Sequence, residues 1–524
     1  MRIFIALTLI LMPFGMSTSA QDSEQIAALK AEVTQAVEDN KKMVQEIVDS
    51  LFSFSELGFQ EFETQNYIGN ILEENGFGVK KDVAGLPSGW WATWGNGGPV
   101  IALGTDVDGI PKASQKPGVA YKEPLIEGAP GHGEGHNSGM AVLLAAALAL
   151  QDVMERDNIP GTIVIWPGIA EELLAGKAFF TREGLFNDVD AVLFVHVGSS
   201  LAVSWGKARG TGLISVEYTF KGESSHAAGA PWRGKSALDG VELMNAGWNA
   251  RREHLHPLQR SHYVITDGGD QPNVVPQTAS VWYYIREMNA ENILENYDKL
   301  NKTADGAALM TNTTVSHRVV GGAWPRHYNK PMAEAINENM NAVGMPNWDE
   351  KDQIFAKAVQ ALADTEQKGL DTEVRGVRAP SEFPVSGGSD DIGDISWLVP
   401  TITLNYPANV GNLGGHNWRN TIAMATPVAH KGSVIGAKVV AQTLVDLFMN
   451  PELLTEAHKY FNEVQLVGTT YVPFISVAEK PAIEKNVDIM AKFKPQLKEL
   501  YYDADKYDTY LEQLGITYPT LPEE

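Results

Sequence analysis

The chain has no cysteine among its 524 residues. Disulfide bonds, thiolate nucleophiles and thiolate metal ligands are therefore all excluded. A chain without thiols cannot form mispaired disulfides, so its composition suits an oxidising compartment.

Basic residues are scarce as well. The chain has 41 Lys and Arg residues against 65 Asp and Glu residues, which gives a formal net charge of −24. A nucleic-acid-binding surface needs clustered Lys and Arg side chains, and we therefore expect no nucleic-acid partner. Net charge mainly affects solubility, so it does not identify the substrate.

Long apolar runs are missing too. The run from Ile3 to Met12 is shorter than the roughly 20 residues that span a bilayer, and no other segment looks transmembrane. It follows Arg2 and precedes small residues that end at Ala20, which is typical of a secretory signal peptide at residues 1–20. We expect a secreted or periplasmic protein without a membrane partner. A short lipid-embedded anchor is the alternative.

The sequence does contain alternating strand and helix patterns. Continuous apolar runs, as in strands buried on both faces, occur at residues 100–103, within 161–172, and at 190–198 and 399–407. Helical patterns occur at residues 138–150, 176–183 and 427–448. This alternation predicts an α/β domain with a mostly parallel central sheet.

The middle of the chain has a different pattern. Residues 210–325 contain alternating, half-exposed strands and a helical stretch at 236–253. They predict a small α+β domain inserted into the larger one. Residues 21–209 and 326–524 then form the two parts of the larger domain, and the second part ends in an acidic, helical tail after about residue 450.

Polar residues follow the predicted buried strands. Open α/β sheets bind ligands at the carboxyl edge, so we expect side chains from distant parts of the chain to converge there. The residues in question are Asp106, Asp108, Glu171, Glu172, His196 and His416.

The stretch GHGEGHNSGM at residues 131–140 carries Glu134 and His136 two positions apart. In an extended loop such residues point to the same side, and the flanking glycines allow a close approach. Imidazole and carboxylate groups suit zinc or manganese. We interpret the stretch as a metal-binding loop at the start of a helix. A solvated polar turn with a helix cap is the alternative.

Three further elements could carry chemistry. In AEE, adjacent glutamates diverge, so Glu172 could hold a metal while Glu171 accepts a proton from water. Acids at a helix N-terminus are also common without any function. His226, after a strand of the inserted domain, and Asn273, in a loop framed by Gly and Pro, have structural interpretations as well.

In combination, the motifs HGEGHN, GIAEE, VHVG, PNVVP, GGSDDIGDISW and GGHNW resemble the metal-dependent amidohydrolases of the aminoacylase and carboxypeptidase G superfamily. The chain resembles the branch with hippurate hydrolases and auxin-conjugate hydrolases, and most of all the B-type subunits of aminobenzoyl-glutamate hydrolases. The resemblance extends from about residue 30 to about residue 450. It implies a two-metal, metallopeptidase-type catalytic domain with an inserted lid or dimerisation domain.

The resemblance also implies roles for individual residues. Glu171 would be the general base, and His226 would stabilise the oxyanion in the active site of a partner chain. Asn273 would bind substrate, and Asp391 and Asp394 would shape the wall of the site. The implied ligands of two divalent ions, zinc or manganese, are Glu134, His136, Glu172, His196 and His416.

One position departs from the family pattern. The family branch has a metal-binding cysteine where this chain has Glu134. A carboxylate still donates oxygen to a metal, so we keep Glu134 as a predicted ligand and leave the identity of the metal open.

We therefore predict a hydrolase that cleaves the amide bond of an N-acyl or N-aroyl amino acid, or of a small peptide, next to a carboxylate. The alternatives are a dipeptidase or other exopeptidase, and a non-catalytic binding protein with the same fold. The expected assembly is a homodimer or a complex with an A-type partner.

Overall fold

The computed structural model describes residues 18–380 and 387–523. Residues 1–17 of the predicted signal peptide lie outside this range, so the signal peptide stays a prediction.

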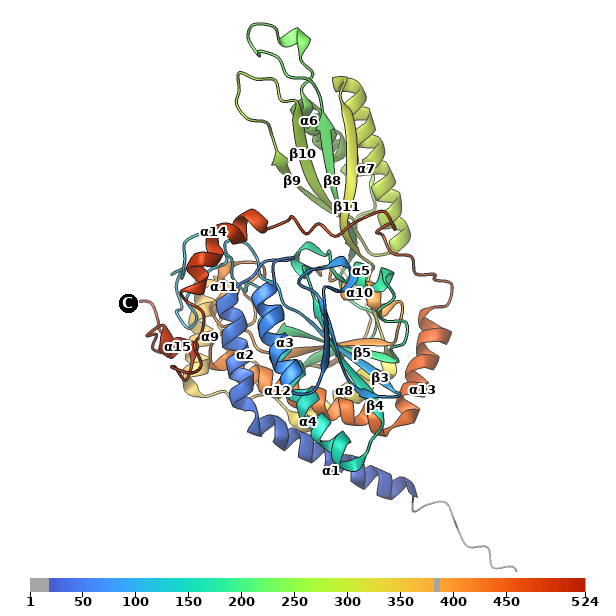
Figure 1. The fold of residues 1–524 in the computed structure, drawn as a ribbon, viewed down its shortest axis with the longest axis vertical. Coiled ribbons are helices and arrows are strands. Elements are labelled where there is room, and N and C mark those ends of the chain that lie inside the picture. Colours follow the sequence, from blue (N-terminus) through green and yellow to red (C-terminus); the bar gives the residue numbers. More distant parts are fainter. Residues whose placement is uncertain (1–17, 381–386, 524) are drawn as a thin grey trace, which may run out of the picture.

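The larger domain is built on an eight-stranded sheet (Figure 1). Its central strands β4, β3, β5 and β14 are parallel, and antiparallel pairings occur towards both edges. Side chains of the central strands are almost all buried, as their continuous apolar runs predict. The α/β fold with a mostly parallel sheet is thus confirmed. In order across the sheet, the strands are β1 (Gly78–Lys81), β2 (Trp90–Asn96), β4 (Gly161–Gly168), β3 (Val100–Asp106), β5 (Ala191–Gly198), β14 (Thr401–Pro407), β6 (Ala202–Ser204) and β13 (Gly376–Arg378).

Two helices form the centre of the helical layer. The helix α4 (Gly139–Asp157) is rich in Ala and Leu, which favour helices, and α12 (Pro427–Met449) begins with a proline at a position that tolerates it. They pack against each other, and α1 (Thr18–Asp39) and α2 (Lys41–Phe54) lie across them. The length and apolarity of α12 would allow it to cross a membrane, but 78% of its most apolar stretch is buried inside the protein, as in a core helix.

Further helices surround this core. The short helices α5 (Lys177–Arg182) and α10 (Ile392–Ser396) pack against each other and against the base of the inserted domain. The remaining helices of the larger domain are α3 (Phe62–Glu74), α5 (Lys177–Arg182), α8 (Lys330–Val343), α9 (Glu350–Leu362), α10 (Ile392–Ser396), α11 (Trp418–Thr421), α13 (Pro451–Tyr460), α14 (Val487–Lys498) and α15 (Tyr510–Gln513).

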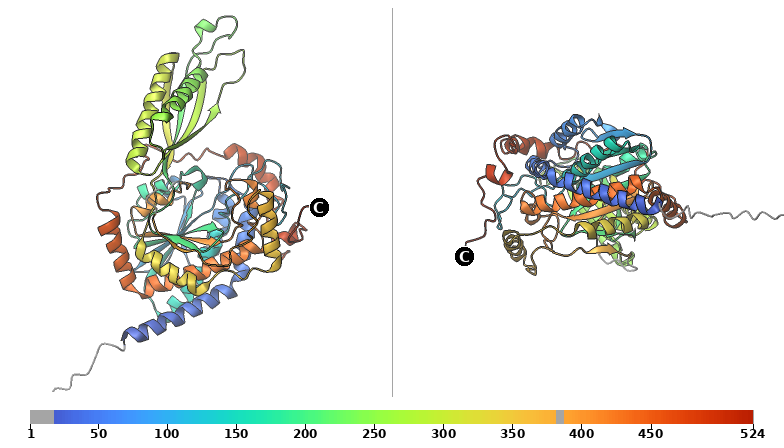
Figure 2. Two further views of the ribbon diagram at one scale, coloured as in Figure 1. Left: turned by 180° about the vertical axis from the view of Figure 1, so that it is seen from behind. Right: turned by 90° about the horizontal axis from the view of Figure 1, so that it is seen from below.

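The inserted segment forms a separate antiparallel sheet that projects from the larger domain (Figures 1 and 2). Two helices, α6 (Ala237–Arg251) and α7 (Ala290–Thr311), pack on this sheet. Buried and half-buried residues alternate along β10, as the sequence pattern predicts. In order, the strands are β11 (Thr314–Ala323), β8 (Gly212–Lys221), β10 (Thr278–Glu287) and β9 (Arg260–Asp267).

The C-terminal segment connects the two domains. After α13 it forms a short π-helical turn at Phe461–Gln465, and then runs without regular helix to α14. On this path Lys485 forms an ion pair of 3.1 Å with Glu217 of β8, and Glu484 pairs with Arg318 of β11. The predicted helical tail is therefore helical only in part, and its irregular stretch holds the inserted domain against the larger one.

Candidate active site

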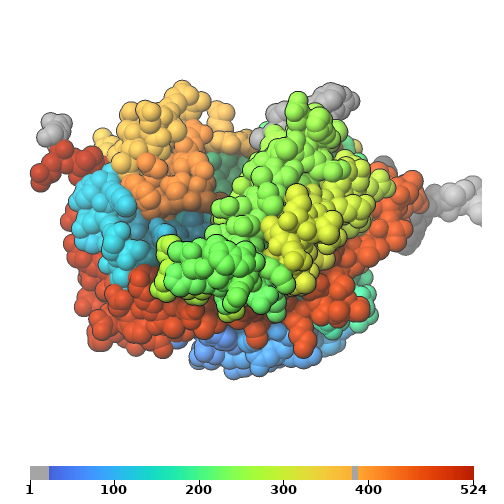
Figure 3. All heavy atoms as spheres, turned by 90° about the horizontal axis from the view of Figure 1, so that it is seen from above, coloured from blue at the N-terminus to red at the C-terminus, as the bar shows by residue number. Residues whose placement is uncertain are grey.

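A cavity of about 710 Å³ lies at the carboxyl ends of the central strands. Its wall contains residues of the larger domain and, from β10 of the inserted domain, Tyr284 and Arg286. Figure 3 shows from above how the inserted domain stands over part of the larger one. The edge of the sheet at which parallel strands end is thus the place where both domains meet around one cavity.

The structure brings six of the predicted residues together at this cavity. Oε2 of Glu134 is 2.8 Å from Nε2 of His416, and Oε1 of Glu134 is 3.8 Å from Nε2 of His196. Nδ1 of His416 is 3.5 Å from Oε2 of Glu172. Those four residues and Glu171 line the cavity, and His136 is buried beside them, 3.9 Å from Glu172.

The conformation of the loop 131–140 depends on glycine. Gly135 has a φ of +110°, which L side chains rarely adopt, and a Cβ there would lie 2.5 Å from Sδ of Met424. The neighbouring His136 donates from Nδ1 to the backbone oxygen of Asp108, 3.1 Å away. Its Nε2 is therefore the atom that carries the free lone pair, and it is buried without a protein partner.

The other histidine of the loop serves a different purpose. Nε2 of His132 is 3.0 Å from the backbone oxygen of Leu51 in α2, and the side chain is fully enclosed. Burial lowers the pKa of His132 to about 3, so the ring is neutral at ordinary pH. Through this hydrogen bond, His132 holds the loop 131–140 against helix α2 of the helical layer.

The glutamate pair lies on a short 3₁₀ turn, Glu171–Leu173, directly after β4. The carboxylate of Asp108 accepts hydrogen bonds from the backbone N–H groups of Glu171, at 3.2 Å, and Glu172, at 3.1 Å. The preceding Ala170 has a φ of 51°, a strained value for a residue other than glycine. Asp108 thereby fixes the backbone that carries both glutamates.

The acids of the cluster lie close together in a buried place. Burial and the nearby Asp106 and Asp390 raise the pKa of Glu171 well above its ordinary value. Burial and the negative charge of Glu134 raise the pKa of Glu172 to about 8. Cations bound among these carboxylates would reverse both effects, because positive charge stabilises the ionised form.

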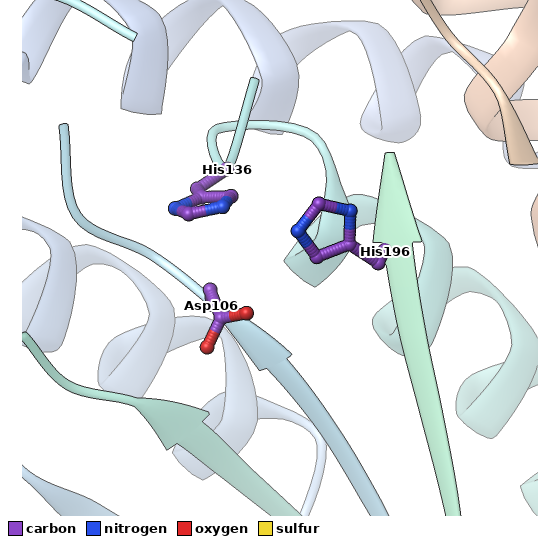
Figure 4. A group of neighbouring side chains, drawn as sticks. All are labelled: Asp106, His136 and His196. Atoms are coloured by element: carbon purple, nitrogen blue, oxygen red, sulfur yellow. The ribbon is translucent and has the colours of Figure 1, made fainter. Parts of the chain in front are cut away.

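The donor atoms fit divalent metal ions. Asp106, His136 and His196 reach towards one another from separate elements (Figure 4), with ligand atoms within 4.8 Å of each other. Glu134, His136, Glu171 and Glu172 form a second such group. Nδ1 of His196 is 2.9 Å from the backbone oxygen of Val197, so Nε2 is its free atom, as in His136. Oδ2 of Asp106 and Oε1 of Glu172 are buried without a protein partner.

Sequence reasoning missed several residues of the site. The sequence identifies Asp106 and Asp108 only as residues at a strand end and does not single out Asp390, in the GGSDD motif; all three belong to the cluster. The buried Lys177 lies 2.5 Å from Asp106 and forms an ion pair with Asp391. No signal in the sequence distinguishes this lysine from a surface residue.

The two aspartates predicted to shape the wall are both buried. Asp391 accepts hydrogen bonds from Lys177 and from the backbone N–H of Gly176. Asp394 accepts a hydrogen bond of 2.7 Å from the hydroxyl of Tyr471 in the C-terminal segment. Neither lines the cavity itself; each supports a residue or segment beside it.

His226 and Asn273 lie apart from the cavity of their own chain. They are neighbours, because the backbone N–H of Ala227 donates to the backbone oxygen of Asn273 at 3.0 Å. His226 follows the end of β8 that points away from the larger domain (Figure 1), and its side chain is exposed. The role of His226 in the active site of a partner chain and the substrate-binding role of Asn273 stay predictions.

Comparison with known proteins supports this description. The family model described as peptidase dimerisation domain matches residues 210–308. The chain is 33% identical to the B subunit of p-aminobenzoyl-glutamate hydrolase from Escherichia coli, over 82% of this chain and 94% of that protein. It is 26% identical to a Xaa-Arg dipeptidase of Mus musculus, over 87% of this chain and 97% of that protein. Its fold is similar to a solved aminobenzoyl-glutamate utilization protein of Klebsiella pneumoniae, with a TM-score of 0.52 at 17% identity, over 82% and 98% of the two chains.

Proposed function

The chain belongs to the M20 family of metal-dependent peptidases and amidohydrolases, and we propose that it hydrolyses the amide bond between an acyl or aroyl group and an amino acid. The observation that carries this proposal is the convergence of Glu134, His136, Glu172, His196 and His416 around Glu171 in one cavity. The names of its relatives, an aminobenzoyl-glutamate hydrolase and a dipeptidase, support this class of substrate.

We assign the residues as follows. The donors of Glu134, His136, Glu172, His196 and His416, with Asp106, would hold two divalent ions, zinc or manganese. Bound there, such ions lower the pKa of water and polarise an amide carbonyl. Glu171 would accept the proton of the attacking water and pass it to the leaving nitrogen. Asp108 would keep Glu171 and Glu172 in place through their backbone N–H groups.

The experiment uses the purified full chain and a panel of N-acetyl, N-benzoyl and 4-aminobenzoyl amino acids. We expect hydrolysis that stops after removal of metal by a chelator and returns with zinc or manganese. Hydrolysis that survives complete removal of metal would contradict the proposal. Binding of these amides without turnover by the metal-loaded protein would instead indicate a non-catalytic binding protein.

A dipeptidase is the second candidate, and the similarity to the Xaa-Arg dipeptidase favours it. Dipeptides have a free α-amino group, whereas N-acyl amino acids do not. Parallel assays with Ala-Glu and N-acetyl-Glu distinguish the two, because a dipeptidase cleaves the former and an N-acyl amidohydrolase the latter.

For the assembly we propose a homodimer through the inserted domain, with His226 and Asn273 acting at the site of the partner chain. Within the described residues, strand β9 pairs only with β10, so its outer edge is open for pairing. Val264 and Ile265 on this strand are 58% and 47% exposed. A complex with an A-type partner is the alternative, because the chain matches both the B and the A subunits of the E. coli hydrolase. Light scattering of the chain alone distinguishes the two.

We propose export to the periplasm or the exterior, on the basis of the predicted signal peptide. Mass spectrometry of the protein from its native cells should find a mature N-terminus after Ala20.

A further inference from the structure

A third buried glutamate lies behind the glutamate pair of the site. Glu61 directly precedes α3, is fully enclosed, and is not among the described residues that line the cavity. Its Oε1 accepts a hydrogen bond of 2.9 Å from the backbone N–H of Ala170, and its Oε2 accepts one of 2.6 Å from the hydroxyl of Ser88. Ala170 is the residue immediately before Glu171, so Glu61 binds the backbone that carries the predicted general base.

Glu61 does not serve the helix that it precedes. An acidic residue at the start of a helix commonly binds the free N–H groups of that helix. Within the described structure the Glu61 side chain makes no such bond to α3. Glu56 makes it instead, because its carboxyl oxygens accept from the backbone N–H groups of Glu63, at 3.0 Å, and Thr64, at 2.9 Å. Glu61 is therefore free to bind a different segment, and that segment is the turn after β4.

This turn depends on its hydrogen-bond partners. Ala170 has a left-handed backbone, with φ 51° and ψ 41°, which residues other than glycine keep only where surrounding contacts hold them. The three successive N–H groups of residues 170–172 point at buried carboxyl groups, the first at Glu61 and the other two at Asp108. Ala170 is fully enclosed, so its N–H would be buried without this partner if Glu61 were removed.

The segment 56–61 packs directly on this turn. A Cβ added at Gly58 would lie 2.8 Å from the Cα of Ala170. The backbone N–H of Gly109 donates to the backbone oxygen of Glu56 at 2.7 Å, which ties the same segment to the loop after β3. The segment is therefore a fixed support from which a side chain can hold the turn in place.

We propose that Glu61 is a positioning residue of the active site: its hydrogen bond to the N–H of Ala170 holds the strained turn in the conformation that places Glu171 in the cavity. The proposal rests on the function proposed above, in which Glu171 accepts a proton. Glu172 stands on the same turn, so the loss of Glu61 should also weaken metal binding.

The hydrogen bond of Glu61 carries this role, and its charge does not. Complete burial and the negative charge of Asp108 raise the pKa of Glu61 to about 8, so the side chain is largely neutral at pH 7. Glutamine can then replace it, because the amide keeps an oxygen for the N–H of Ala170 and its NH₂ group can donate to the hydroxyl of Ser88. Alanine and methionine offer no oxygen, and methionine still fills the space.

The test compares Glu61→Ala, Glu61→Met and Glu61→Gln in the full, metal-loaded chain, with the N-acyl or N-aroyl amino acid that the wild type hydrolyses fastest. We expect kcat to fall by about tenfold to a hundredfold in the alanine and methionine variants, as for other residues that orient metal ligands from behind. KM should stay near the wild-type value, because Glu61 does not line the cavity. Glu61→Gln should keep most of the wild-type kcat. Wild-type kcat in Glu61→Met, or a loss in Glu61→Gln as large as in Glu61→Met, would overturn the proposal.

Glu56→Ala is the matched control. Glu56 is buried in the same segment as Glu61, but its side chain binds the N–H groups of α3. Glu56→Ala should lower the free energy of unfolding in urea, as Glu61→Ala does, and should keep most of the wild-type kcat. If Glu56→Ala lowers kcat as much as Glu61→Ala, any disturbance of the segment suffices and Glu61 has no positioning role of its own.

Zinc binding separates this proposal from the hydrolytic function, since it needs no substrate. The affinity of the wild type, Glu61→Met and Glu61→Gln for zinc is measured by competition with a chelator. We expect it to be about tenfold weaker in Glu61→Met and close to the wild-type value in Glu61→Gln. If the wild type hydrolyses no amide but zinc affinity follows this order, the hydrolytic function fails and the positioning role stands. If amides are hydrolysed and all three proteins have the same kcat and zinc affinity, the hydrolytic function stands and the positioning role fails.

Discussion

The carboxylate of Glu134 lies 2.8 Å from the imidazole of His416, so a loop before α4 meets a loop before α11 at this point. The second oxygen of the same carboxylate is 3.8 Å from His196 at the end of β5. Glu134 thus occupies the centre of the cluster. The sequence resemblance implies a cysteine at this position, so this carboxylate is where the site departs from the expected pattern.

We predict that Glu134 is a metal ligand and that it affects which metal the site prefers. Glu134→Ala removes one negative charge and one donor group, so metal content and activity should both fall. Glu134→Cys should restore metal binding with a shift towards zinc, because thiolates are soft ligands whereas carboxylates suit manganese. Elemental analysis after reconstitution in a mixture of zinc and manganese measures both effects. The exposed Glu127 of the same region provides the control, Glu127→Ala, and unchanged metal content in Glu134→Ala would refute the prediction.

We predict that His226 acts in the site of a partner chain. Its side chain is exposed and absent from the cavity of its own chain, so His226→Ala should lower activity only if a second copy supplies it. A mixture of His226→Ala chains with Glu171→Gln chains should regain part of the activity, since a mixed dimer contains one intact site. The control is His254→Ala, another exposed histidine of the inserted domain. A fully active monomer would exclude this arrangement.

We predict that His327 lowers stability in mild acid. Burial and the charge of Lys207 lower the pKa of His327 from 6.5 to about 4. Between these values the unfolded chain binds a proton that the folded chain does not, so stability falls as the pH drops below 6.5. Relative to pH 7.5, the loss at pH 5 should be about 2 kcal/mol.

His327→Phe measures this loss, because phenylalanine keeps a ring beside Trp397 but does not titrate. Urea unfolding gives the difference in the free energy of unfolding between wild type and variant at each pH. Any packing cost of the substitution that does not depend on pH cancels when the differences at pH 5 and pH 7.5 are compared. The variant should gain relative to the wild type at pH 5. If the free energy of unfolding differs between wild type and variant by the same amount at pH 5 and pH 7.5, His327 has the same pKa in the folded and unfolded chains.

The sequence predicts the elements that have a strong period or a continuous apolar character. The buried strands at 100–106 and 191–198 and the helix α12 are examples, because burial on both faces leaves a clear hydrophobic run. The predicted polar residues meet at the cavity for the same reason, since parallel strands bring their carboxyl ends to one edge.

Other features of the site depend on tertiary contacts that leave no local pattern. Lys177 is charged and stands on a short helix, yet it is enclosed by Asp106 and Asp391 from elsewhere in the chain. The sequence of the irregular stretch between α13 and α14 is typical of a surface tail. In the structure, however, Lys485 within it forms an ion pair with Glu217 of the inserted domain. The role of Asp108 in holding the backbone of Glu171 also requires the folded turn.

The central claim is that the chain hydrolyses amides with Glu171 as the proton acceptor beside bound metal. The most direct measurement is the rate of hydrolysis of 4-aminobenzoyl-Glu by Glu171→Gln, with the metal content of the same sample determined in parallel. The glutamine side chain in this variant keeps the shape of the Glu171 side chain, but its amide group cannot accept the proton. We expect activity to fall at least about a hundredfold while metal content stays at the wild-type level. Turnover equal to that of the wild type, with metal bound, would contradict the account.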